Sequence, residues 1–348
     1  MRIRLITSLS LLLTVVIIAS LVKFFFDLTV KIEIVSTGEE LCRPVLGIDS
    51  SEDIVVDPSD GTAYISSLWR RDPEEMEGRI YRFRINRDDQ PEIVSPDLDF
   101  EFRPLGLGFL ETPENRFIFA VNRLEGVGCV ERFRIDANQL IHEESYCDDQ
   151  FHSANDVLPL SESEFYLTND HGSSNAFLQF VEDWTGFGRG EVRFFDGESS
   201  RRVAGGISWA NGIAITQDGS RLLVSSTRSR QLLLYIRSAE DNSLDLLFVK
   251  DAQTGLDNIN IDANGRFWIA SHPDLLAFWQ YSRDRESISP SQVIRTEILP
   301  SGEIEMGTVY LSDGDYLSGS SSAAVWRDTL LIGSVFDHRF LVCRLPED

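Results

Sequence analysis

The segment Asn258-Ile-Asn-Ile-Asp-Ala-Asn-Gly-Arg-Phe-Trp-Ile269 reads as a short apolar strand, a polar turn and a second apolar strand. Its Asn-Gly step is typical of a hairpin, because glycine supplies the positive φ that such a turn needs. Two stretches repeat the pattern with an Asp-Gly turn, residues 54–65 and 212–224. Weaker or shorter copies cover 106–118, 156–167 and 323–333. These copies predict a chain built from repeated β-hairpins.

A third strand with alternating aromatic residues follows each hairpin. The six third strands are predicted at residues 79–84, 130–134, 191–194, 231–235, 277–281 and 340–344. The unit therefore recurs about every 50 residues, which is typical of a propeller with six four-stranded blades. A β-sandwich would also show many short strands, but without a fixed period. We predict an all-β fold, a six-bladed β-propeller over residues 31–348, and no amphipathic helix beyond Val30.

The charge of the chain limits its partners. Its 348 residues include 32 Lys plus Arg and 56 Asp plus Glu, a formal net charge of −24. Nucleic acids and anionic membrane surfaces require a basic face, so neither is expected as a partner. Most of the acidic residues are expected to serve solubility, and a few are candidate ligands for hard cations.

The first thirty residues have the features of a targeting segment. Arg2 and Arg4 precede an apolar run from Leu5 to Val22, which is about the length of a membrane span. No small-x-small cleavage site follows, so residues 1–30 are predicted to be an uncleaved signal-anchor. This places the propeller in the lumen or outside the cell, either membrane-anchored or secreted with the segment retained. A cleaved signal peptide is the alternative.

The four cysteines are compatible with that oxidising compartment. Cys42 and Cys343 lie near the two ends of the folded part. In a propeller the terminal strands usually share one blade, so a bond between these two cysteines would hold the ring closed. Cys129 and Cys147 flank a possible hairpin; a cross-strand bridge and two buried free thiols both remain open.

Polar residues recur directly before the inner strands of the predicted blades. The pairs at this position are Glu52-Asp53, Leu105-Gly106, Asn155-Asp156, Asn211-Gly212 and Asp257-Asn258. Equivalent positions on successive blades converge at one mouth of the central channel. A single Asn or Asp would be explained by capping of a turn, but the repetition favours a shared site.

The predicted ring offers only oxygen ligands. It consists of Glu52, Asn155, Asn211, Asp257 and Asn258, with two carboxylates to balance a divalent cation. Calcium prefers such a set, whereas zinc prefers His and Cys, which the ring lacks. Asp53 and Asp156 lie one residue further along two of the strands. With the backbone carbonyl of Leu107 they form a second candidate Ca²⁺ site, more buried than the first.

Seven motifs of the chain carry a resemblance to a known family. They are Gly47-Ile-Asp-Ser-Ser-Glu-Asp53, Asn155-Asp156, Phe165-Tyr-Leu-Thr-Asn-Asp-His171, Ala210-Asn-Gly-Ile213, Leu256-Asp-Asn-Ile259, Ser271-His-Pro273 and Leu330-Leu-Ile-Gly-Ser-Val-Phe336. From Cys42 to the C-terminus the chain resembles the serum paraoxonase/arylesterase family of calcium-dependent lactonases. The resemblance implies hydrolysis of lactones or aryl esters, a terminal Cys42–Cys343 disulfide and a retained hydrophobic N-terminus.

The resemblance also implies two calcium ions. The family's catalytic calcium falls on Glu52, Asn155, Asn211, Asp257 and Asn258. Its structural calcium falls on Asp53, Asp156 and the carbonyl of Leu107.

The chain departs from the family at a His-His pair proposed to activate water. Those positions hold Leu105 and, nearby, Arg123, and neither side chain can serve as a general base. Asp257 and His171 are therefore the candidate catalytic groups, and His272 is interpreted as structural. Two alternatives stay open: a non-catalytic, calcium-stabilised propeller that binds a lipid or a protein, and a strictosidine-synthase-like propeller with other chemistry.

Overall fold

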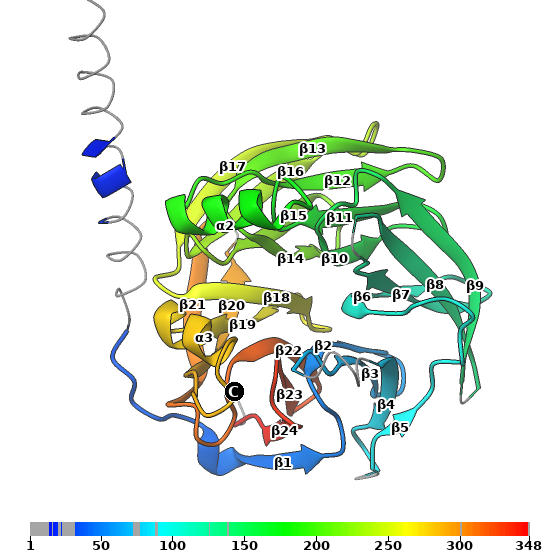
Figure 1. The fold of residues 1–348 in the computed structure, drawn as a ribbon. Helices are drawn as coiled ribbons and strands as arrows, with labels where there is room; N and C mark the ends of the chain where they lie inside the picture. Colours follow the sequence, from blue (N-terminus) through cyan, green and yellow to red (C-terminus); the bar gives the residue numbers. More distant parts are fainter. Residues whose placement is uncertain are drawn as a thin grey trace, which may run out of the picture.

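The six-bladed ring predicted from the sequence is present. The computed structural model describes residues 14–15, 17–19, 22, 32–71, 77–87, 90–124, 126–137, 139–299 and 301–346. Within these residues, 24 strands form six four-stranded antiparallel sheets around a common centre (Figure 1). The all-β propeller prediction is confirmed.

The blades follow one another along the chain, from an inner strand to an outer one. Blade 1 contains β2 (Ser51–Val56), β3 (Thr62–Leu68), β4 (Gly78–Arg84) and β5 (Glu92–Ile93). Blade 2 contains β6 (Pro104–Glu111), β7 (Arg116–Asn122), β8 (Gly128–Asp136) and β9 (Gln139–Asp148). Blade 3 contains β10 (Ala154–Pro159), β11 (Phe165–Asn169), β12 (Gly190–Phe195) and β13 (Ser200–Ile207).

The second half of the ring repeats this order. Blade 4 contains β14 (Ala210–Ile215), β15 (Arg221–Ser226), β16 (Gln231–Arg237) and β17 (Leu244–Asp251). Blade 5 contains β18 (Gly255–Ile261), β19 (Phe267–His272), β20 (Ser291–Ile298) and β21 (Ile304–Ser312). Blade 6 contains β22 (Ser320–Trp326), β23 (Thr329–Ser334), β24 (Arg339–Arg344) and β1 (Cys42–Leu46), which follows the short 3₁₀ helix η1 (Glu39–Leu41).

Blade 6 closes the ring with strands from both ends of the chain. Strand β1 pairs with β24, and Cys42 lies opposite Cys343 in that pairing. The two cysteines are bonded, with an S–S distance of 2.05 Å. Cys129 and Cys147 lie opposite each other on β8 and β9 and are bonded as well, so the cross-strand alternative is the correct one.

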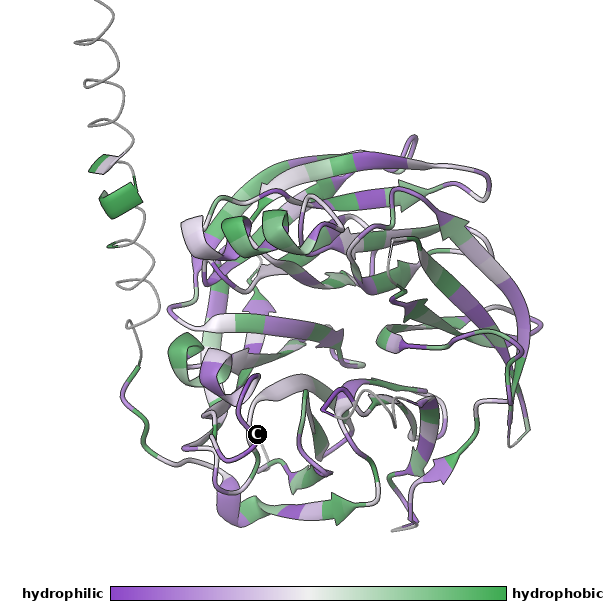
Figure 2. Cartoon of the chain, viewed as in Figure 1, coloured by the Kyte–Doolittle hydropathy of each residue, from purple (hydrophilic) through white to green (hydrophobic). Residues whose placement is uncertain are grey.

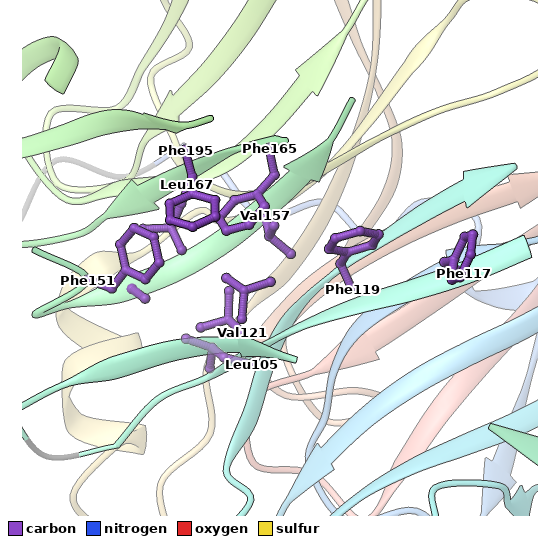
Figure 3. Close-up of a cluster of buried hydrophobic side chains, with 11 residues drawn as sticks. Leu105, Phe117, Phe119, Val121, Phe151, Val157, Phe165, Leu167 and Phe195 are labelled. Atoms are coloured by element: carbon purple, nitrogen blue, oxygen red, sulfur yellow. The ribbon is translucent and has the colours of Figure 1, made fainter. Parts of the chain in front are cut away.

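The hydrophobic core is divided into clusters that lie between neighbouring blades. The cluster between blades 2 and 3 contains Phe119, Phe165 and Phe195, and the last two rings stack at 4.9 Å between centroids (Figure 3). Leu105 belongs to the same cluster, next to Val121 (Figure 3). Burial of large apolar side chains at every blade interface stabilises the ring without a single central core.

Two helices interrupt the strands, and the prediction that no amphipathic helix follows Val30 is wrong. Helix α2 (Ala176–Thr185) begins at Asn175, whose side chain accepts hydrogen bonds from two backbone N–H groups, and ends at Gly186 with φ of 65°. Its apolar residues stand out in Figure 2, and Phe177 and Phe180 are exposed.

The strand predicted over residues 277–281 is also wrong. These residues lie in helix α3 (Leu275–Tyr281), because Asp274 caps the N–H groups of Leu276 and Ala277 at 3.1 Å. The third strand of blade 5 is β20, further along the chain. The capping aspartate outweighs the aromatic alternation that suggested a strand.

The predicted signal-anchor falls almost entirely outside the described residues. Among the residues that the structure does describe, no helix combines the length and apolar character required to cross a membrane.

Candidate metal centre

The inner strands share an irregularity at one end of the channel. In each of the six, the pairing with the second strand shifts register near its start. Two residues fall inside each shift, and such bulges re-aim side chains out of the ladder. The six pairs are Glu52-Asp53, Leu105-Gly106, Asn155-Asp156, Asn211-Gly212, Asp257-Asn258 and Ser321-Ser322. The fold therefore places all the predicted side-chain ligands at equivalent points, inside the strands rather than before them.

Four of these side chains present oxygens without partners. The structure contains five buried carboxylate or amide oxygens that find no hydrogen-bond partner in its described part. Four belong to the predicted ring: Glu52 Oε2, Asn155 Oδ1, Asn211 Oδ1 and Asn258 Oδ1. The fifth, Glu182 Oε1, lies 3.9 Å from Arg189 Nη1. A buried polar atom without a partner costs about 1–3 kcal/mol. Four together approach the roughly 5–15 kcal/mol net stability of a whole protein, so a ligand is needed.

The amide groups are held by their nitrogen atoms, which leaves the oxygens free. Asn211 Nδ2 donates to Thr227 Oγ1 at 3.1 Å, and Asn258 Nδ2 donates to the Glu52 carbonyl at 3.3 Å. Asn155 Nδ2 lies 3.4 Å from Asp170 Oδ2. Each amide is thus fixed from one side and offers its oxygen on the other.

The two ring carboxylates lie close enough to influence each other. Burial is the main reason that the pKa of Glu52 is raised to about 8; the charge of Arg70 opposes this shift and the charge of Asp257 contributes to it. Asp257 is buried, and its Oδ2 accepts a hydrogen bond from His272 Nε2 at 2.9 Å. A divalent cation among these oxygens would remove both the burial cost and the repulsion. An all-oxygen set with two carboxylates suits Ca²⁺.

The candidate ligand set of the ring depends on amide oxygens as much as on carboxylates. Across the residues described by the structure, no three His, Cys, Asp or Glu side chains come together at one point where they could hold a metal ion. Glu52 and Asp257 complete a site only when the amide oxygens are counted.

The second predicted set is a pair of buried carboxylates that link the blades. Asp53 accepts hydrogen bonds from the Leu107 N–H at 2.7 Å and from Ser322 Oγ at 2.8 Å. Asp156 accepts from the Ile213 N–H at 2.9 Å. Burial raises the pKa of Asp53 to about 6 and that of Asp156 well above its usual value, with the charge of Asp53 adding to the second shift. The atom of Leu107 that contacts Asp53 is its N–H; ligation through its carbonyl stays a prediction.

Blade 2 approaches these carboxylates through a glycine. A Cβ at Gly106 would lie 2.5 Å from the Cα of Asp156 and 2.6 Å from its Oδ1. Only a residue without a side chain permits this contact between the inner strands of blades 2 and 3.

A charged network lies above the ring. Arg123 binds Asp170 through two hydrogen bonds, at 2.5 and 3.1 Å, and also donates to Ser153 Oγ at 3.2 Å. Burial alone would raise the pKa of Asp170, but the charges of Arg123 and His171 hold it well below its usual range. Because Asp170 also contacts Asn155, this network positions one of the ring amides.

His171 is enclosed by carboxylates. Its Nδ1 lies 2.7 Å from Asp170 Oδ1 and its Nε2 lies 2.9 Å from Asp183 Oδ1, on helix α2. Burial acts to lower the pKa of His171, but the hydrogen bonds to both acids raise it to about 10. At neutral pH the ring is a cation with both nitrogens occupied, so it has no free nitrogen to take a proton from water.

His272 supports Asp257 from the other side. It is fully buried, stacks on Phe278 of α3 at 3.7 Å between ring centroids, and donates from Nε2 to Asp257 Oδ2. This arrangement fits the structural interpretation of His272.

Two sets of residues at this site were not predicted from the sequence. Ser321 and Ser322 occupy the ring position of blade 6, and Ser321 Oγ donates to the Glu52 carbonyl at 2.6 Å. These serines lie directly before the predicted strand of residues 323–325, and this placement could have predicted that they belong to the ring. Asp183 lies on a helix that was not predicted, so nothing placed it near His171.

Comparison with known proteins agrees with this geometry. A family model described as Arylesterase matches residues 31–345. The chain belongs to the arylesterase family. Among curated relatives, the serum paraoxonase/arylesterase 2 of Rattus norvegicus is 30% identical, over 90% of this chain and 91% of the relative. The serum paraoxonase/lactonase 3 of Mus musculus is also 30% identical, with the same coverage.

Solved structures share the fold of this arylesterase-family chain at low identity. A luciferin-regenerating enzyme is 14% identical with a TM-score of 0.54, covering 87% of this chain and 96% of that one. The calcium-binding protein regucalcin from Agrobacterium tumefaciens is 14% identical with a TM-score of 0.52, covering 89% of this chain and 93% of that one. These likenesses concern the propeller alone.

Proposed function

We propose that this protein is a calcium-dependent hydrolase of lactones or carboxylic esters. The observation that carries the proposal is the set of four buried oxygens without partners, on Glu52, Asn155, Asn211 and Asn258. Membership of the arylesterase family supports the reaction type. Relatives named arylesterase and lactonase support ester and lactone substrates.

The ring residues would hold one ion at the channel mouth, and Asp53 with Asp156 would hold a second. A calcium ion bound to the ring would polarise the scissile carbonyl and stabilise the oxyanion that forms on it. The amides of Asn155, Asn211 and Asn258 are oriented for this by their own hydrogen bonds.

Asp257 is the candidate general base. Its Oδ2 is fixed by His272, which leaves Oδ1 to accept a proton from the attacking water. The water oxygen bonds to the carbonyl carbon, the bond from that carbon to the alkoxy oxygen breaks, and the proton passes to the alkoxy oxygen. A lactone gives a hydroxy acid in this way. His171, the other sequence candidate, is instead assigned a positioning role through Asp170.

Leu105 favours a second candidate, the non-catalytic binding propeller. The family resemblance implies a histidine at this position, and the leucine found there is packed into the core between blades 2 and 3 (Figure 3). In that case calcium would stabilise the fold without supporting turnover.

Hydrolysis of an aliphatic lactone and of phenyl acetate, measured with excess Ca²⁺ and with EDTA, distinguishes the hydrolase from the non-catalytic binding propeller. We expect turnover that EDTA abolishes and that Glu52→Gln removes, while Glu305→Gln, an exposed glutamate on β21, retains it. If neither substrate is hydrolysed in an EDTA-sensitive manner while Ca²⁺ still raises the melting temperature, the binding module replaces the hydrolase.

A further inference from the structure

A basic cavity adjoins the metal centre. It has a volume of about 560 Å³, and its lining includes Arg70, Arg103, Arg123, His152 and Leu105. Leu105 holds the ring position of blade 2, so the cavity opens directly beside the ring. Among the described residues, every charged side chain in its lining is an arginine, although acidic residues outnumber basic ones by 56 to 32 in the whole chain. A local excess of positive charge in an acidic protein attracts anions.

Two of the three arginines are already paired. Arg123 is held by both oxygens of Asp170. Arg103 donates from Nε to Glu101 at 2.6 Å. Each of these two arginines therefore already has a carboxylate partner.

Arg70 differs from both. Its Nη2 is buried and has no hydrogen-bond partner in the part of the chain that the structure describes. Arg70 lines the same cavity as Leu105, which holds the ring position of blade 2, so its side chain lies on the ring side of the cavity. A buried donor on a cation without a partner is costly.

Bound calcium would leave less negative charge near Arg70 to balance its positive charge. The two ring carboxylates, Glu52 and Asp257, would together balance the charge of one divalent ion. With that ion bound, the ring would carry no net charge, and the buried Nη2 of Arg70 would still lack a hydrogen-bond partner among the described residues. An anion in the cavity would supply both the missing charge and the missing acceptor.

We propose that this cavity binds an oxyanion on the substrate, a carboxylate or a phosphate, and that Arg70 pairs with it. A planar guanidinium suits either group, because both accept two parallel hydrogen bonds. The substrate class is thereby narrowed to anionic lactones or esters, in which the charged group lies outside the scissile bond. This inference rests on the proposed hydrolase function.

Two lactones of similar shape test the preference: a γ-lactone with a carboxylate on the carbon next to the ring oxygen, and the same ring with a methyl group there. Hydrogen bonds to charged groups imply a preference for the anionic lactone of about 10-fold or more in kcat/KM. Arg70→Gln should remove it and Arg70→Lys should retain part of it. Arg344→Gln, whose side chain is 77% exposed on β24, should change nothing.

Binding gives a second readout that does not depend on turnover. Calorimetry with tetrahydrofuran-2-carboxylate and with methyl phosphate should show binding that weakens in EDTA and is lost in Arg70→Gln. The probe that binds with the higher affinity indicates whether the cavity prefers a carboxylate or a phosphate. Binding that is equal in Arg70→Gln, or absent for both probes, overturns the inference.

The two proposals fail in different ways. Equal, calcium-dependent turnover of both lactones removes the anion preference and keeps the hydrolase. Arg70-dependent binding of a probe with no turnover of either lactone removes the hydrolase and keeps the anion site.

Discussion

Replacement of Asn258 by leucine separates the cost of a buried oxygen from the binding of a cation. Asn258 Oδ1 has no partner among the described residues, and the side chain is 1% exposed. Leucine has the same branched shape, although it is larger, and it removes that oxygen, which relieves about 1–3 kcal/mol. It also removes the hydrogen bond to the Glu52 carbonyl, worth about 0.5–1.5 kcal/mol. In EDTA the variant should therefore be within about 2 kcal/mol of the wild type, and of either sign.

Calcium should distinguish the two proteins clearly. At a Ca²⁺ concentration 100 times the dissociation constant, binding stabilises the wild type by about 2.7 kcal/mol. Asn258→Leu lacks one ligand, so its calcium-induced gain should fall below about 1 kcal/mol. Urea unfolding followed by tryptophan fluorescence, with Ca²⁺ and with EDTA, measures both quantities.

A matched control lies two residues further along β18. Asn260 Nδ2 donates to the Ala323 carbonyl at 3.1 Å, and its oxygen is not among the partnerless atoms. Asn260→Leu should keep the full calcium-induced gain. The reasoning is refuted if Asn258→Leu also keeps it, or if Asn258→Leu loses much more than about 3 kcal/mol in EDTA, since the oxygen would then have a partner already.

Three other predictions follow from the fold. Replacing Cys42 and Cys343 by serine opens a loop of 301 residues, which should lower the free energy of unfolding by about 6 kcal/mol in the chain-entropy model; an unchanged urea midpoint would contradict this. Gly106→Ala should destabilise the protein by about 1–3 kcal/mol, whereas Gly307→Ala, whose Cβ would meet no neighbour, should not; equal melting temperatures would refute the close approach. The pKa of His171 is raised in the folded state to about 10, so its ion pairs stabilise fully below pH about 6.5 and are lost as pH rises through 10. The stability deficit of His171→Gln should shrink over that range, and a pH-independent deficit would show that the ring is neutral.

The sequence was sufficient to predict the ring of blades because the hairpin turns carry strong local signals. Asn264-Gly265 and Asp218-Gly219 punctuate strands of fixed length, and Gly265 and Gly219 take φ of 80° and 70°. The ring positions followed from the same period, since any residue at a fixed offset from such a turn recurs at one end of the channel.

Contacts between residues far apart in the chain could not be predicted from local sequence patterns. Asp183 contacts His171 from α2, a helix that was not predicted, and no local pattern marks Arg70 as a buried side chain whose Nη2 has no partner among the described residues. The helix α3 could have been found, because Asp274 directly before an apolar run is an N-cap signal.

Diffraction from crystals grown with Ca²⁺ tests the central claim most directly. The account predicts an ion at the channel mouth, about 2.3–2.6 Å from Glu52 Oε2, Asn155 Oδ1, Asn211 Oδ1 and Asn258 Oδ1. Water at hydrogen-bonding distance from these four oxygens, with no ion under saturating Ca²⁺, would contradict it.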